Sequence, residues 1–196
     1  SPLGTSTEEA EVVEQILPVA SRKLLKDKAT RIKEITDFSS YGILHFAGHG
    51  VALPQSAQHS FLVLEFPEDS IQAPQLFTVA ELEERNLVVE LLVLSACQTH
   101  AGTLVQEEGI ISLARAGITA GSNSVVASFW AVRQADKPLF FTTFYAALVA
   151  GDDRDVAIQK AQLAVLEDGE DAAHPFYWAA FQNFGLNEPI EMINSR

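Results

Sequence analysis

The sequence predicts the α/β class, with a mainly parallel sheet that helices cover on both faces. Four short segments are apolar along almost their whole length: residues 41–46, 61–64, 91–94 and 124–130. Strands of this kind are buried on both faces, as in parallel sheets. Segments with helical apolar spacing separate them, which favours helices as connections. Apolar residues make up 47% of the 196 residues, which is enough for one core, so we expect a single domain.

The predicted helices follow from apolar periodicity and from residues that suit helix starts. Thr5 with Glu8 three residues later, and Thr78 with Glu81, have the spacing of a capping box. After Thr5 the apolar residues recur at helical spacing. In chain order, the predicted helices cover residues 5–17, 29–35, 78–86, 109–116, 138–149 and 156–166.

The remaining segments are predicted mainly as loops. The glycine-rich residues 47–50 lead out of the first strand as a loop. Residues 51–60 and 67–75 are predicted as loop insertions, because prolines in them interrupt regular strand pairing. Near the C-terminus, Trp178 and Phe181 are spaced for one face of a helix, and we expect both in the core.

The composition excludes several classes of partner. With 26 acidic and 13 basic residues the formal net charge is -13, which repels nucleic-acid phosphates and anionic lipid. The basic run at 22–33 fits a solvated helix face better than a binding arm. We therefore expect no direct nucleic-acid contact and no membrane contact. No nucleotide-binding glycine pattern occurs, and no cofactor is expected.

The single cysteine bears on both compartment and chemistry. One cysteine excludes an internal disulfide, and the sequence opens without a signal-peptide pattern, so the expected compartment is the reducing cytoplasm. A free cysteine is often only a small core residue. Cys97, however, follows a buried strand and leads into the polar segment 98–102, which can expose its sulfur.

His49 is the candidate base for Cys97. A thiol needs a base to act as a nucleophile near neutral pH. His49 also follows a buried strand, and its two glycine neighbours let a substrate backbone approach closely. The carboxyl ends of parallel strands are where an α/β sheet binds its ligands. We therefore expect His49 and Cys97 to meet at that edge of the sheet.

A metal site is not expected. His45 and His49 have the spacing of a helical zinc motif, but on a strand the two residues lie about 13 Å apart by rise alone. No acidic residue stands next to His45 in the sequence. His45 is therefore predicted as a core residue, or as one that supports its neighbours in the site.

The chain resembles the CHAT domain, a caspase-like family of cysteine peptidases related to separase. The resemblance is carried by blocks that run in order from residue 3 to residue 185, above all HFAGHG at 45–50 and LSACQT at 94–99. It implies a caspase-like three-layer sandwich over residues 1–196. Longer family members have further sequence before this region, so the chain fits the catalytic portion of a longer protein.

The resemblance also implies roles for individual residues. It makes His49 and Cys97 the catalytic dyad, and it forms the oxyanion hole from the backbone N–H groups of Gly50 and Cys97. Such donors stabilise a tetrahedral oxyanion by roughly 3 to 4 kcal/mol each. Ser95, two residues before the nucleophile, would line the primary pocket, with the strand after Val125 as its other wall.

The segment after that strand departs from the family pattern. Many CHAT sequences continue from the tryptophan with an acidic pair, whereas this chain reads WAVRQ at 130–134. Trp130 either lines a subsite or packs. Arg133 would repel a basic P1 residue, and Gln134 has no charge to hold one, so we expect a basic P1 to be disfavoured. An acidic and an apolar P1 both remain open.

The sequence thus predicts a cytoplasmic cysteine endopeptidase that cleaves a protein or peptide substrate through an acyl-enzyme. The resemblance also implies regulation by attached repeats or by a partner protein. The competing hypothesis is a catalytically silent module that keeps the same fold for protein interaction or regulation.

Overall fold

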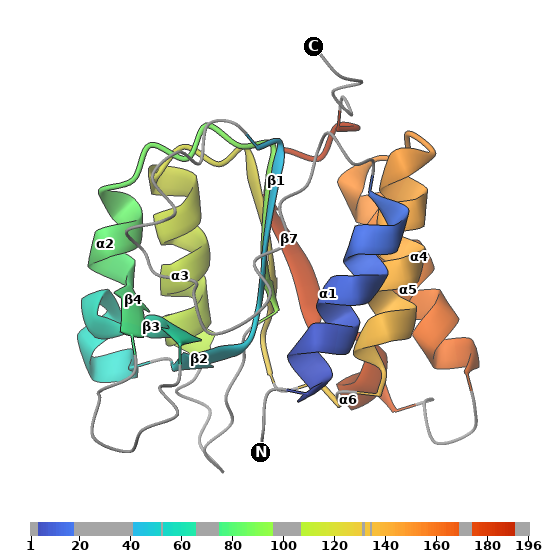
Figure 1. Ribbon diagram of the computed structural model, residues 1–196, viewed down its shortest axis with the longest axis horizontal. Coiled ribbons are helices and arrows are strands. Elements are labelled where there is room, and N and C mark those ends of the chain that lie inside the picture. The colour runs from blue at the N-terminus through green and yellow to red at the C-terminus, as the bar shows by residue number, and fades with distance from the viewer. Residues whose placement is uncertain are drawn as a thin grey trace.

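The computed structural model describes most of the chain, namely residues 4–17, 41–51, 53–65, 75–95, 107–130, 132–133, 135–168 and 174–190. These residues form a four-stranded central sheet with helices on both faces, and a second, three-stranded sheet (Figure 1). The α/β class and the mostly parallel, helix-covered sheet are confirmed. The second sheet was not predicted.

The central sheet has the strand order β1-β5-β6-β7. Three strands run parallel, β1 (Ile43–Ala47), β5 (Leu91–Ser95) and β6 (Ser124–Ser128), and β7 (Phe181–Gly185) is antiparallel to β6. All residues of β5 and β6 are buried. This burial explains why both strands are apolar almost throughout.

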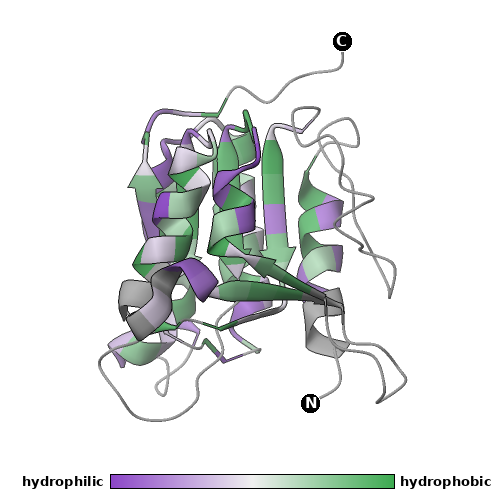
Figure 2. Ribbon diagram, turned by 90° about the vertical axis from the view of Figure 1, so that its left-hand side faces the viewer, coloured by the Kyte–Doolittle hydropathy of each residue, from purple (hydrophilic) through white to green (hydrophobic). Residues whose placement is uncertain are grey.

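Two helix layers cover this sheet. On one face lie α1 (Gly4–Ile16), α4 (Lys137–Val149) and α5 (Arg154–Glu167), and on the other lie α2 (Val79–Glu83) and α3 (Glu107–Thr119) (Figure 1). The short helix α6 (Pro175–Trp178) lies near the end of the sheet from which β1 leads into β2. Figure 2, seen from the side of α2 and α3, shows mainly hydrophobic strands behind helices of mixed hydropathy.

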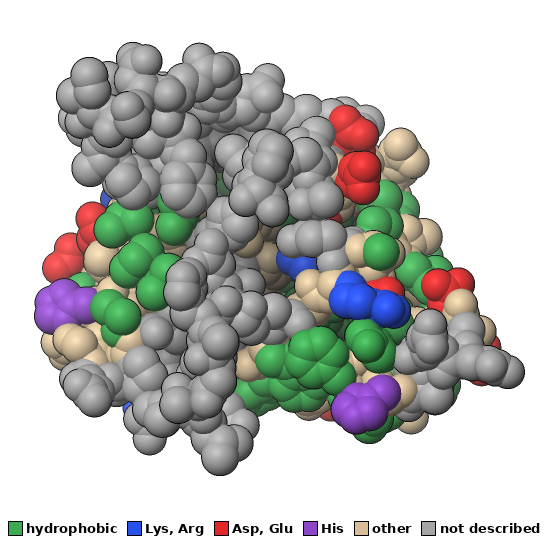
Figure 3. All heavy atoms as spheres, turned by 90° about the horizontal axis from the view of Figure 1, so that it is seen from below, with side chains coloured by type: hydrophobic (Ala, Val, Ile, Leu, Met, Phe, Trp, Pro, Cys, Tyr) green, Lys and Arg blue, Asp and Glu red, His purple; other side chains and the backbone are tan. Residues whose placement is uncertain are grey.

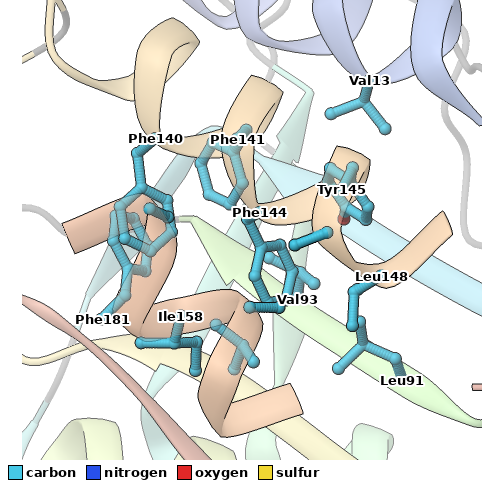
Figure 4. Packing of buried hydrophobic residues seen from close by; sticks show 14 of the residues in the cluster. Val13, Leu91, Val93, Phe140, Phe141, Phe144, Tyr145, Leu148, Ile158 and Phe181 are labelled. Carbon is cyan, nitrogen blue, oxygen red and sulfur yellow. The ribbon is translucent and has the colours of Figure 1, made fainter. Parts of the chain in front are cut away.

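The core is divided by the sheet, because neighbouring residues of a strand point to opposite faces. Leu91 and Val93 of β5 pack with α4 and α5, whereas Leu92 and Leu94 pack with α2 and α3. Aromatic side chains of α4 fill the first half of the core (Figure 4). The tightest of their contacts is a stack onto the first residue of β7, with 4.4 Å between ring centroids; it joins Phe140 and Phe181.

The second sheet consists of antiparallel strands at the end of β1. Its strands are β2 (His49–Val51), β3 (Phe61–Glu65) and β4 (Gln75–Thr78), and a 3₁₀ helix, η3 (Pro54–His59), joins the first two. Only β3 was predicted as a strand. The segment 47–50, predicted as a loop, instead turns within one residue from β1 into β2.

Most predicted helices are present with altered ends. The capping box of Thr78 and Glu81 is confirmed at the start of α2, and α3 is longer than predicted. The prediction of one helix carrying Trp178 and Phe181 is wrong, because Trp178 ends α6 whereas Phe181 begins β7 and pairs with Ser128. The predicted helix at 29–35 lies outside the described residues.

Candidate catalytic site

The carboxyl ends of β1 and β5 lie side by side at one edge of the central sheet (Figure 1). Ala47, the last residue of β1, pairs with Ser95, the last residue of β5. His49 comes two residues after Ala47, and Cys97 comes two residues after Ser95. Neighbouring strands are about 4.8 Å apart. Both predicted catalytic residues therefore follow strand ends that lie at the same level of the sheet.

The structure describes this dyad in part. The backbone of His49 and Gly50 belongs to β2, where His49 pairs with Val63, and Gly50 is buried. The side chain of His49, and Cys97 and Gln134 altogether, lie outside the described residues. The dyad, the oxyanion hole and the role of Gln134 therefore stay predictions.

An aromatic and basic surface lies on the same side of the molecule. Figure 3 shows this face, where hydrophobic side chains gather beside basic and histidine side chains. The ring of Trp130 stacks on Phe176 of α6, with 6.2 Å between centroids, and its indole N–H donates to the Phe176 carbonyl at 2.7 Å. This contact fixes the segment after β6 against α6.

Arg133 is held in place by two neighbours. Its Nε and Nη2 donate to the two carboxylate oxygens of Asp136 at 2.7 and 3.0 Å, and its guanidinium lies 3.9 Å from the centroid of the Tyr177 ring. Asp136 is largely buried. The ion pair offsets the charge of Arg133. The predicted repulsion of a basic P1 residue stays a prediction, and this pairing would weaken it.

Ser95 is the last residue of β5. It is fully buried, and its carbonyl accepts a hydrogen bond from Lys137 Nζ at 3.0 Å. Its hydroxyl makes no hydrogen bond of standard geometry in the described part of the chain, although it lies near enough to Glu9 to favour the carboxylate form. The role of Ser95 as a pocket wall stays a prediction.

Four polar side chains contact one another near the carboxyl ends of β1 and β5, and we call them the strand-end cluster. The cluster consists of Glu9 of α1, His45 of β1, and Lys137 and Tyr145 of α4. Glu9 accepts from His45 Nε2 at 2.8 Å and pairs with Lys137 Nζ at 3.4 Å. The other ring nitrogen of His45 lies 2.7 Å from the hydroxyl of Tyr145.

The protonation states of two cluster members follow from their surroundings. Burial raises the pKa of Glu9, but the hydrogen bond from His45 and the charges of His45 and Lys137 outweigh it, so the pKa is lowered overall. Burial, helped by the charge of Glu9, raises the pKa of Tyr145 well above 10.0. Near neutral pH, Glu9 is therefore a carboxylate and Tyr145 keeps its proton.

The sequence predicted His45 as a core or supporting residue, but it showed no acidic residue next to His45 along the chain. The neighbour is Glu9, which lies 36 residues earlier. Glu9 falls at helical spacing from the buried Val13 and from Ile16, so an acidic residue on the apolar face of α1 was the available signal. Lys137, just before the apolar run of α4, gave a similar signal.

Within the described residues, no group of three or more histidine, cysteine, aspartate and glutamate side chains is arranged to hold a metal ion. The helices in the same residues are all too short or too polar to cross a membrane.

Comparisons with known proteins show the family of this chain. Residues 1–186 match the family model of the CHAT domain, and the chain belongs to this family. It is also similar to tetratricopeptide repeat protein 28 of Homo sapiens and of Mus musculus, with 26% identity over an alignment that is 226 residues long in each case. The alignment covers 98% of this chain and 9% of each of those proteins, so the chain spans only a small part of their length.

Proposed function

We propose that this CHAT domain is a caspase-like cysteine endopeptidase in which His49 and Cys97 form the catalytic dyad. The observation that carries the proposal is the register of the central sheet, in which Ala47 pairs with Ser95. Each candidate catalytic residue comes two residues after one of these paired strand ends, so the register supports a meeting of His49 and Cys97 at the same level of the sheet. Residues 1–196 are proposed as a single domain of a longer protein.

The proposed reaction has two steps. His49 takes the proton of the Cys97 thiol, and the sulfur attacks the carbonyl carbon of a peptide bond. The N–H groups of Gly50 and Cys97 stabilise the oxyanion. His49 then gives its proton to the leaving amine as the C–N bond breaks, which leaves an acyl-enzyme. Water attacks the thioester, the carboxylic acid departs, and the thiol is restored.

Substrate binding is assigned to the segment after β6 and to Ser95. An extended peptide would lie along this segment, with Trp130, Arg133 and Gln134 beside its P1 side chain. The paired charges of Arg133 and Asp136 favour a neutral or acidic P1 residue over a basic one, by a modest factor.

The cellular setting is proposed from the same features. The similar proteins are named for tetratricopeptide repeats, which supports a repeat domain as a regulatory partner. A sequence with a single cysteine suits the reducing cytoplasm. The acidic net charge of -13 favours a protein substrate over nucleic acid or membrane.

A thiol-directed peptide probe tests the proposal. The folded wild type should become labelled at Cys97, and the label should disappear in Cys97→Ala and fall sharply in His49→Ala. A folded wild type that the probe leaves unlabelled, across peptides with acidic, apolar and basic P1 residues, would instead support the silent interaction module.

A further inference from the structure

The strand-end cluster contains more ionisable groups than a core needs for packing. Glu9 is 1% exposed, and the side chain of its partner Lys137 is 7% exposed. Burying charges is costly unless they are paired and hydrogen-bonded, and apolar residues of similar volume often stabilise a core as well or better. We therefore looked for a role of the buried charges of Glu9 and Lys137 other than stabilising the fold. The described dyad chemistry does not use them.

Lys137 holds the end of β5. Its ammonium donates to the carbonyl oxygen of Ser95 at 3.0 Å. Ser95 is the last residue of the strand, and the chain reaches Cys97 two residues later. A charge-assisted hydrogen bond of this kind is stronger than one between neutral groups. Ser95, from which the chain continues to Cys97, is thus fixed to the start of α4.

His45 holds β1 in a similar way. Both of its ring nitrogens have partners, Glu9 on one side and Tyr145 on the other, and the ring meets the edge of Phe141 at 4.7 Å between centroids. A ring held at both nitrogens cannot rotate without losing both contacts. His45 lies four residues before His49, and only the bend at Gly48 separates its strand β1 from β2, which His49 begins.

Glu9 joins the two anchors, since its two oxygens contact His45 and Lys137 separately. His45 Nε2–H donates to the carboxylate of Glu9, and Nδ1 shares a hydrogen bond with the hydroxyl of Tyr145. The second oxygen of Glu9 faces the ammonium of Lys137, so this carboxylate pairs with both partners at once.

We propose that the strand-end cluster positions the ends of β1 and β5 relative to each other and thereby sets the distance between His49 and Cys97. Glu9, His45 and Lys137 are positioning residues, since they act on the dyad through the backbone. This inference rests on the proposed function, because it concerns the geometry of the same dyad.

A second buried cation supplies a matched control. Arg154 of α5 is also 1% exposed. It donates to the carbonyl of Glu90, contacts the Glu90 carboxylate and donates to the carbonyl of Glu188. Glu90 precedes β5, so Arg154 anchors the amino end of the strand that Lys137 anchors at its carboxyl end. Arg154→Lys should lower stability without moving the carboxyl ends of β1 and β5.

The test measures the alkylation of Cys97 by iodoacetamide as a function of pH. Cys97 is the only cysteine of the chain, so the rate reports on one sulfur. The rate follows the thiolate fraction, which depends on His49 only if the two side chains are in contact. The wild type is compared with His49→Ala, with the cluster variants Glu9→Gln, Tyr145→Phe, Lys137→Arg and Lys137→Met, and with the control Arg154→Lys. All are measured at a temperature where near-ultraviolet circular dichroism shows a folded state.

The wild type should react faster than His49→Ala below pH 8. Glu9→Gln and Tyr145→Phe should lose this His49-dependent rate by roughly 10- to 100-fold, because a displacement of about 1 Å has effects of this size. Arg154→Lys should keep the wild-type profile. Lys137→Arg, which retains a donor to Ser95, should recover more of the rate than Lys137→Met.

Three results would overturn the inference; the first two leave the proposed function intact, and the third does not. If both cluster variants keep the wild-type profile while folded, the cluster does not position the dyad, and the proposed function stands. The same conclusion holds if Arg154→Lys loses the rate equally, because the effect would then be general destabilisation. If wild type and His49→Ala already share one profile, the dyad itself is absent, and both proposals fail.

Discussion

Replacing Glu9 by glutamine gives the sharpest test of the buried charges. The amide of Glu9→Gln can still accept from His45, whose Nε2 lies 2.8 Å from the oxygen. It cannot balance the ammonium of Lys137, which lies 3.4 Å from the other oxygen. Removing one partner of a buried ion pair typically destabilises a protein by about 3 to 5 kcal/mol. We expect a loss of about 3 kcal/mol at pH 7, because one hydrogen bond survives.

The pH dependence follows from the lowered pKa of Glu9. Its folded-state pKa lies below the ordinary value of 4.5, so between these two values the unfolded chain binds more protons than the folded protein. The stability that Glu9 provides is therefore present above about pH 4.5 and is lost as the pH falls through the folded pKa. Each pH unit in that window removes about 1.4 kcal/mol.

Urea unfolding of wild type and Glu9→Gln between pH 7 and pH 3.5 measures this contribution. The difference in the free energy of unfolding should be constant near neutral pH and should shrink below about pH 4.5. Glu90→Gln serves as the control, since its carboxylate is partly exposed and contacts the other buried cation. A difference that stays constant down to pH 3.5, or that is absent at pH 7, would refute the reasoning.

Three further predictions concern the same core and the neighbouring surface. Tyr145→Phe leaves a ring nitrogen of His45 without its partner and should lower the free energy of unfolding in urea by about 1 to 3 kcal/mol. Because the pKa of Tyr145 is raised in the folded protein, the wild type should lose stability above pH 10. This alkaline loss should be smaller in the variant. Phe144→Ala removes a fully buried ring and should lower the same free energy by about 3 to 5 kcal/mol, whereas a loss under 1 kcal/mol would contradict the packing in Figure 4. Arg133→Ala should lower the free energy of unfolding by about 1 to 3 kcal/mol, because it leaves the largely buried carboxylate of Asp136 without its two hydrogen bonds. In a peptide-library cleavage assay it should raise cleavage after basic P1 residues relative to wild type, because Asp136 loses its cation; an unchanged P1 profile would remove Arg133 from the substrate site.

The elements that could be predicted from the sequence are those that local physics determines. The capping box of Thr78 and Glu81 needs residues only three apart, and α2 starts where it was predicted to start. The apolar run of β5 marks a strand buried on both faces wherever it occurs. In both cases the signal lies within a few residues of the element.

The elements that were missed depend on distant partners. Phe181 has helical spacing from Trp178, yet it forms β7 because its backbone pairs with Ser128 and its ring stacks on Phe140. The short strand β2 likewise exists through its pairing with β3. Hydrogen bonds between segments far apart in the chain leave little trace in local periodicity.

The candidate site divides in the same way. The sequence alone determined which residues could carry the chemistry, because a single cysteine and a glycine-flanked histidine each follow a buried strand. That the ends of these strands are level follows from the packed sheet. The packed layers also bring Glu9 to His45 in β1, 36 residues away, and Lys137 to Ser95 in β5, 42 residues away. Strand register and the pairing of buried charges arise when the layers pack, so no segment read alone contains them.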